Sequence, residues 1–247
     1  MQKNRNLIVG IYGLPRYSSQ DLYLDGIEML NKRLKVKSLY IHSWDEKIQV
    51  DIGPRAKKIL EQMVIEPPLD FSETIDKYSI FADTFLDAAN WRLTSLETSQ
   101  KNKETFNVIS QMSSISRLAS LILDGLEQNK DDVFLLTRFD ALISGKVDLA
   151  LLNHFDVLLS RQHSYYPDCV QIMTIKGLFE LSKLENKMMA NNFYDLFDGS
   201  AEALRESLYR ESRVKMTFDN FYYELFNMTH VKPRKNSFLD KLKLFFS

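Results

Sequence analysis

The sequence predicts an α/β protein in which a mostly parallel central sheet is flanked by helices. Short continuous apolar runs are typical of strands buried on both faces, as in a parallel sheet. The clearest run lies within residues 131–140 and ends at Arg138 and Asp140. A strand, a helix and a second strand follow one another between residues 7 and 44, an order that favours parallel pairing.

The bulk composition fits one α/β domain, residues 1–229, followed by a tail, residues 230–247. Apolar residues make up 45% of the chain and aromatic residues 12%, which is enough for a core and argues against disorder. The net charge of -1 gives no electrostatic argument for nucleic-acid binding. Cys169 is the single cysteine, so we expect no internal disulfide, no cysteine-based metal site, and a reducing cytoplasmic compartment.

The first predicted strand, Leu7–Gly13, ends in a turn that Gly13 and Pro15 favour. Arg16 follows this turn, at a position where its guanidinium could bind a phosphate. The glycine spacing does not fit a dinucleotide-binding loop. Residues 20–34 have helical periodicity.

The second strand, Val36–Trp44, ends in His42, Ser43 and Trp44. Trp44 fits either the core or a surface on which a ring could stack. His42 has no second histidine at metal-ligand spacing, so we expect a hydrogen-bonded structural role.

The middle of the chain is predicted to be helical. Gly53–Ile65 indicates a short helix that ends before two prolines, and residues 100–104 indicate a polar loop. Apolar residues recur at three- and four-residue steps over 105–128, which predicts a long helix. Another stripe of that helix carries Asn107, Gln111 and Arg117, which could contact a nucleotide or form a solvated face.

The last third predicts strands at 155–160, 169–173 and 214–218 and helices at 176–189 and 200–209. A polar and aromatic loop, 161–168, joins the first two strands. The tail has basic residues and an apolar helical side, which fits an amphipathic helix lying on an anionic membrane or docking on its own domain. No signal peptide or transmembrane span is predicted.

Several of these pieces, in this order, resemble bacterial lipopolysaccharide and capsule glycosyltransferases with a GT-A-type fold. The pieces are the turn Gly13–Arg16, the Trp44-Asp45 pair, the Asn- and Gln-rich helix, Arg138-Phe139-Asp140 and the segment from Asp168. The resemblance covers residues 7–218. It implies a Rossmann-type sheet and transfer of a sugar from a nucleotide-sugar donor to a glycan or lipid-linked acceptor. Together with the basic tail, we expect a cytoplasmic protein at the inner face of the membrane.

The resemblance also implies roles for single residues. By this resemblance, the residues expected to contact the donor are Arg16, Trp44, Asn107, Gln111, Arg117 and Arg138. Asp140 lies where the family has a carboxylate that binds Mn²⁺ or Mg²⁺. Arg138, however, replaces the first carboxylate of the family's Asp-x-Asp. Either Asp140 still holds the metal together with diphosphate oxygens, or Arg138 and Arg16 neutralise the leaving diphosphate.

Transfer with inversion needs a base near the acceptor hydroxyl. Asp168 is the first candidate and His163 the second, although Asp168 would equally suit a turn cap. The alternative function is a non-catalytic scaffold or binding protein in glycan assembly. A hydrolase is disfavoured because the chain has no Gly-x-Ser-x-Gly motif.

Overall fold

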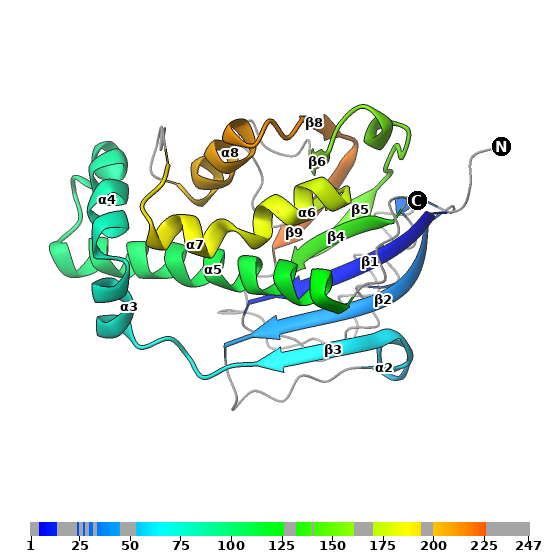
Figure 1. Ribbon diagram of the computed structural model, residues 1–247, viewed down its shortest axis with the longest axis horizontal. Helices are drawn as coiled ribbons and strands as arrows, with labels where there is room; N and C mark the ends of the chain where they lie inside the picture. Colours follow the sequence, from blue (N-terminus) through cyan, green and yellow to red (C-terminus); the bar gives the residue numbers. More distant parts are fainter. Residues whose placement is uncertain are drawn as a thin grey trace.

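A seven-stranded sheet is the centre of the fold (Figure 1). The computed structural model describes residues 5–13, 24, 27, 30–31, 34–44, 53–125, 132–139, 141–160, 170–193 and 200–225. The sheet has the spatial order β3-β2-β1-β4-β7-β6-β8. Its strands are β1 (Arg5–Tyr12), β2 (Leu34–Ser43), β3 (Leu60–Ile65), β4 (Val133–Arg138), β6 (Val157–Ser160), β7 (Val170–Met173) and β8 (Met216–Asp219).

The sheet is mostly parallel, as predicted. The strands β3, β2, β1 and β4 pair in parallel, and so do β6 and β8. Only β7 runs the other way among the described strands of this sheet, because it pairs antiparallel with both β4 and β6. Strand direction depends on the path of the connections, so the sequence pattern of β7 did not indicate its reversal.

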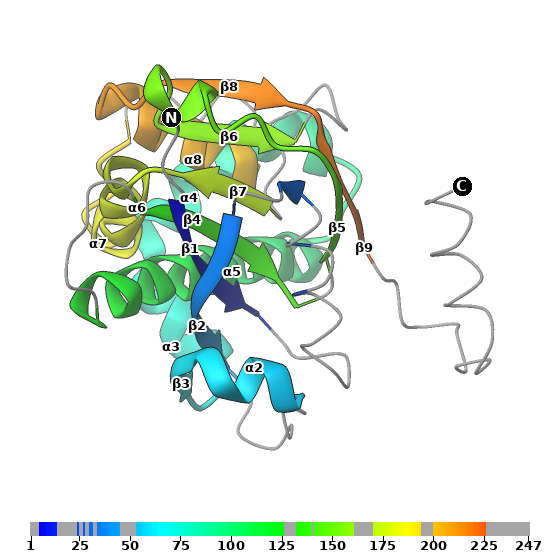
Figure 2. The ribbon, with the colours of Figure 1, turned by 90° about the vertical axis from the view of Figure 1, so that its right-hand side faces the viewer.

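Helices and a strand ribbon cover the two faces. The helices are α2 (Pro54–Ile59), α3 (Phe71–Lys77), α4 (Ser79–Leu93), α5 (Thr98–Gly125), α6 (Ile175–Ser182), α7 (Leu184–Met189) and α8 (Ala201–Glu211), with a 3₁₀ turn η1 (Leu151–Asn153). One core lies between the sheet and α4–α8. The other lies under α2 and the antiparallel ribbon of β5 (Ala141–Gly145) and β9 (Phe221–Leu225). Figure 2 shows this ribbon on the side of the sheet opposite to α6 and α7.

Two predicted elements are wrong. Gly53–Ile65 is not one helix, because α2 stops at Ile59 and the next six residues form β3 at the edge of the sheet. The polar segment 100–104 is not a loop but part of α5, whose first turns extend the predicted helix toward α3 and α4 (Figure 1). The pairing of β3 with β2, and the packing of α5 on α3 and α4, override these local patterns.

The other predicted strands, the long helix and the helix at 200–209 are confirmed with shifted ends. The predicted helix 176–189 is two helices, α6 and α7. The predicted helix 20–34 lies mostly outside the described residues. The ribbon of β5 and β9 was not predicted. The predicted amphipathic helix of the tail, residues 230–247, lies outside the described residues. No helix in the described part of the chain is long and apolar enough to cross a membrane.

Candidate functional site

The carboxyl ends of four neighbouring strands meet at one edge of the sheet, which we call the carboxyl edge. The parallel register places Arg138 of β4 beside Tyr12 of β1, and Tyr12 beside His42 of β2. Pairing continues past the strand ends, since the Phe139 N–H donates to the Tyr12 carbonyl at 3.2 Å. The strand ends are therefore held rigidly side by side.

The chain reverses its direction across the sheet between β1 and β4. From β1 it proceeds to β2 and β3 on one side, and it then returns through α5 to β4 on the other side of β1. In open α/β sheets, ligands bind outside the carboxyl ends of the two strands that flank such a switch point. The carboxyl ends of β1 and β4 are therefore the candidate functional site.

Gly13 leaves space at this position. It follows β1 directly and has a φ of 97°, a conformation that side chains rarely allow. A Cβ on Gly13 would meet no atom within 4 Å among the described residues. Among the described residues, none covers the backbone at the end of β1.

Arg138 supplies a positive charge at the neighbouring strand end, and its side chain is half-buried. Arg16, Asp140, His163 and Asp168 lie outside the described residues, so their positions at this site stay predictions. The described residues at the ends of these undescribed segments do lie at the carboxyl edge: Gly13, Phe139, Ser160 at the end of β6, and Val170 at the start of the reversed strand β7.

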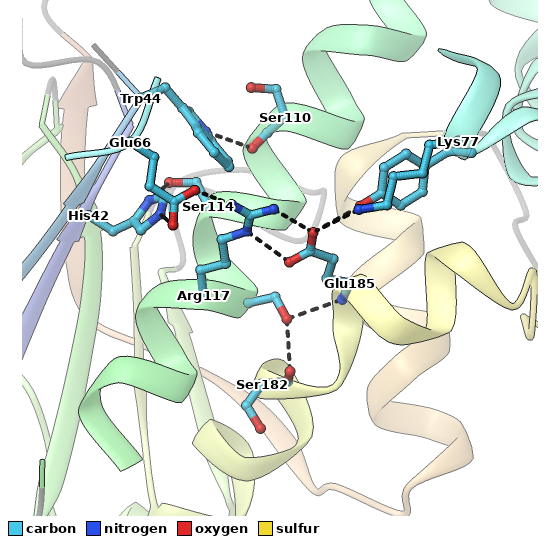
Figure 3. A network of polar contacts seen from close by, with 11 residues as sticks. His42, Trp44, Glu66, Lys77, Ser110, Ser114, Arg117, Ser182 and Glu185 are labelled. Carbon is cyan, nitrogen blue, oxygen red and sulfur yellow. Dashed lines mark hydrogen bonds and ion pairs between the residues drawn. The ribbon is translucent and has the colours of Figure 1, made fainter. Parts of the chain in front are cut away.

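A second polar site surrounds Arg117 in the middle of α5 (Figure 3). Its guanidinium forms an ion pair with Glu66, which follows β3. It also donates two hydrogen bonds to Glu185 of α7, from Nε at 3.0 Å and from Nη2 at 2.8 Å. Tyr78 donates to the same Glu185 carboxylate at 2.9 Å, and Lys77 lies 4.0 Å from it. Arg117 thus joins β3, α5 and α7.

The ionisation of Glu185 and Tyr78 follows from these contacts. Burial alone would raise the pKa of Glu185, but the hydrogen bonds and charge of Arg117 outweigh it, so the pKa lies below its ordinary value. Burial raises the pKa of the Tyr78 hydroxyl to about 12. At neutral pH the Glu185 carboxylate is therefore ionised and Tyr78 is a hydrogen-bond donor.

Trp44 is buried beneath this network, with 5% of its surface exposed. Its indole Nε1 donates to the Ser110 carbonyl at 3.2 Å, and the Arg117 guanidinium lies 4.7 Å from the ring centroid. The cation–π contact uses the ring face that was expected to be available for stacking. Of the two predicted alternatives the structure gives the core position, and a contact between Trp44 and a nucleotide stays a prediction.

His42 lies beside Trp44, with their ring centroids 4.9 Å apart. Its Nδ1 is 2.8 Å from the Ser114 hydroxyl, which confirms the expected hydrogen-bonded role. Its Nε2 is buried without a hydrogen-bond partner, and the nearest Glu66 oxygen is 3.6 Å away. Burial lowers the pKa of His42 more than Glu66 raises it, so the imidazole is neutral at neutral pH.

The other two predicted helix residues lie nearer the start of α5. Asn107 is exposed and Gln111 is half-buried. Arg117, in contrast, pairs with Glu66 and Glu185. The sequence did not single out Glu66 or Glu185, since carboxylates that pair with Arg117 from 51 and 68 residues away leave no local signal.

A cavity of about 290 Å³ opens beside Arg117. It lies between the end of β3, the second half of α5 and the junction of α6 with α7. Its lining includes His42, Glu66, Arg117, Asp124 and Glu185. We call it the Arg117 cavity.

The residues needed for a divalent metal do not come together in the described part of the chain. No group of three or more His, Cys, Asp or Glu side chains there could hold such an ion. The predicted ligand, Asp140, is outside the described residues.

No protein-family model and no curated protein matches this chain. The features from which a function can be proposed are those of the fold, the carboxyl edge and the Arg117 cavity.

Proposed function

We propose that this protein is a glycosyltransferase with a GT-A-type fold. It transfers a sugar from a nucleotide-sugar donor to a glycan or lipid-linked acceptor in surface polysaccharide synthesis. The supporting observation is the switch point between β1 and β4, where Arg138 lies beside Tyr12 and Gly13 follows with a positive φ. The donor class, a nucleotide-sugar, is the one that the resemblance to glycosyltransferases implies.

Arg138 is suited to a diphosphate. A guanidinium donates two parallel hydrogen bonds to phosphate oxygens and carries a charge that does not depend on pH. As the bond from the sugar to the diphosphate breaks, negative charge grows on the leaving group. A fixed cation beside it lowers the energy of that state more than the energy of the bound donor. Arg16 would add a second cation, and Asp140 with Mn²⁺ or Mg²⁺ would add a third.

The acceptor requires a base, for which Asp168 and His163 remain the proposed residues. Both belong to the segment 161–169, which joins the end of β6 to the start of β7. Those two strand ends lie at the carboxyl edge, so the segment starts and finishes on the donor's side of the sheet. Attachment to the cytoplasmic face of a membrane through the tail is a separate part of the proposal.

The test is an activity panel. The purified chain is incubated with UDP-, GDP- and CMP-sugars, with and without Mn²⁺, and release of the nucleotide is measured. We expect turnover of one donor class and a loss of about 10- to 100-fold in Arg138→Ala, the range for a lost charged hydrogen bond. Lys57→Ala, which removes an exposed cation from α2, should leave turnover unchanged.

Two results would contradict the proposal. The first is no turnover of any donor, and saturable donor binding without turnover would instead favour the non-catalytic binding protein. The second is an Arg138→Ala protein that turns over as fast as the unmodified chain.

A further inference from the structure

Two exposed apolar side chains belong to helices that meet in the helix layer. Ile80 of α4 and Met189 of α7 expose 67% and 41% of their surfaces. Among the large apolar side chains of the described residues, Ile80 has the largest exposed fraction. Exposed apolar side chains that lie together mark surfaces that bind a partner.

The contacts between the two helices bring these side chains to one surface. Helix α7 lies beside α4 (Figure 1). The hydrogen bond from Tyr78 to Glu185 joins them at one end of their contact. At the other end, Asn191 Nδ2 donates to Thr84 Oγ1 at 3.0 Å. Both exposed side chains come between these two hydrogen bonds in the sequence, so they border the same surface.

This surface is also acidic. Helical spacing places Ile80, Asp83 and Asp87 on one side of α4, and both carboxylates are exposed. Lys77 is the one basic residue between positions 76 and 90, and it lies 4.0 Å from a carboxylate of α7. We call Ile80, Asp83, Asp87 and Met189 the α4–α7 surface. A partner that fits it is both apolar and basic.

The tail, residues 230–247, has this complementary composition. It contains five basic residues against one acidic residue, Asp240. Its apolar residues recur at helical spacing, at Phe238, Leu239, Leu242, Phe245 and Phe246. A segment of this kind binds as an amphipathic helix, with its apolar side on an apolar surface. Its lysines then lie where carboxylates of the partner can attract them.

The last described strand ends at a point from which the tail can reach this surface. Strand β9 ends at Leu225, which pairs with Ala141 just beyond β4. Helix α4 lies at the end of the molecule toward which the arrows of β1–β3 point (Figure 1). The segment 226–237, which precedes the apolar part of the tail, can span about 40 Å. That length is comparable with the width of a globular domain of this size.

We propose that the α4–α7 surface binds the tail of its own chain as an amphipathic helix. The apolar side of the tail covers Ile80 and Met189, and its lysines lie beside Asp83 and Asp87. The membrane attachment proposed above uses the same tail residues, so docking and attachment exclude each other. Docking involves neither donor nor acceptor, and it therefore does not depend on the proposed sugar transfer.

The test measures where the tail lies in the full chain. Cys169→Ser removes the single cysteine, and Ser247→Cys then allows a nitroxide to be attached at the end of the tail. The nitroxide broadens the NMR signals of amides close to it. We expect the amide signals of Ile80 and Met189 to lose most of their intensity, and that of Arg5, at the start of β1, to keep it. Equal intensity at all three positions would overturn the proposal.

A mixed sample distinguishes the tail of the same chain from the tail of a second copy. Chain that carries the nitroxide but no isotope label is mixed with isotope-labelled chain that carries no nitroxide. We expect no broadening in this mixture, because the tail docks on its own chain. Broadening of the α4–α7 surface in the mixture would show that a second copy supplies the tail, and it would contradict the proposal.

Variants of the α4–α7 surface test the two kinds of contact separately. Ile80→Ser should weaken docking about tenfold, because the apolar contact is lost. Asp83→Asn together with Asp87→Asn should weaken it about fivefold, the effect of partly exposed charge pairs. In both proteins the amide signal of Met189 should recover intensity.

Two matched controls remove similar side chains from elsewhere. Met63→Ser takes an exposed apolar side chain from β3, and Asp124→Asn takes an exposed carboxylate from α5. Both should leave the broadening at Met189 unchanged. Broadening that the surface variants reduce no more than these controls do would place the tail elsewhere and refute docking on the α4–α7 surface.

Discussion

Arg117 connects parts of the chain that are far apart in sequence. Two glutamates and an indole ring surround its guanidinium, from the end of β3, from α7 and from the end of β2. Because the Glu185 side chain is only 15% exposed, its charge depends on Arg117 for compensation. At the residue scale this guanidinium compensates two carboxylates at once.

Arg117→Met should lower the free energy of unfolding by about 2–4 kcal/mol, since it keeps the aliphatic stem but leaves Glu185 without its partner. Urea unfolding measures the change. In the double variant with Glu185→Gln the loss should be smaller than the sum of the single losses, because the buried charge is gone. Additive losses, or a loss below about 0.5 kcal/mol in Arg117→Met, would mean that the pair behaves as an ordinary surface ion pair.

The lowered pKa of His42 makes the free energy of unfolding depend on pH. Its pKa in the folded protein lies below the ordinary value of 6.5, so the unfolded chain binds more protons between these two pKa values. The free energy of unfolding therefore contains a contribution from His42 that is present above pH 6.5 and is lost as the pH falls toward the folded pKa.

Urea unfolding between pH 7 and about pH 5 checks this sign. The slope from one such group is at most about 1.4 kcal/mol per pH unit. His42→Gln should reduce the acid loss of stability, whereas His154→Gln, at an exposed position, should keep it. An equal loss in the His42→Gln protein and the unmodified chain would refute a neutral buried imidazole at this position.

At the element scale, α5 lies unusually close to β1 at Gly10. A Cβ on this glycine would come within 2.6 Å of Leu136 Cδ2 and within 2.9 Å of the terminal carbons of Leu118 and Ile122. All three side chains are buried in the core between α5 and the sheet, so they have little space to move. Because residue 10 has no side chain, α5 can pack this close to β1.

Gly10→Ala should therefore cost about 1–3 kcal/mol of stability through overpacking. Adding Ile122→Val removes the Cδ1 atom that the new methyl group would meet, so it should restore part of the loss. The midpoint and slope of urea unfolding report both changes. If Gly10→Ala is as stable as the unmodified chain, the helix and sheet have more space between them than the structure shows.

Whether a strand could be predicted from its sequence depended on how it is buried in the fold. Strands β1 and β4, and the second half of β2, were predictable because both faces are buried, which favours apolar runs. Strand β3 was not, because an edge strand with exposed Glu61 and Gln62 lacks such a run. It is a strand because its backbone pairs with β2, a contact between segments distant in sequence. The same holds for β5 and β9, which pair across about 80 residues.

For the candidate site, the sequence could predict which residues end the strands but not what their side chains meet. Arg138 stands at the carboxyl edge as expected, because a strand's end follows from its apolar run. Trp44 and Arg117 were predicted from residue type alone. Their mutual contact, and the glutamates that hold Arg117, come from the packing of β3 and α7 beside α5, which only the assembled fold supplies.

At the scale of the whole molecule, the switch point between β1 and β4 lies at the carboxyl edge of the sheet. Six described strands of the main sheet point their carboxyl ends to it, and the reversed strand β7 starts there. Helices α3 and α4 lie at the end of the molecule toward which the arrows of β1–β3 point (Figure 1). This arrangement directs the ends of several strands toward one region, which is where the proposed donor would bind.

The most direct test is to map where a nucleoside diphosphate binds, by following backbone amide NMR signals of the full chain during titration with UDP, GDP and CDP. We expect saturable shifts at Gly13, Arg138 and Phe139 for one of them, with Arg5 and Val133 at the opposite ends of the same strands unaffected. Shifts that instead cluster around Arg117, or none with any of the three nucleotides, would contradict it.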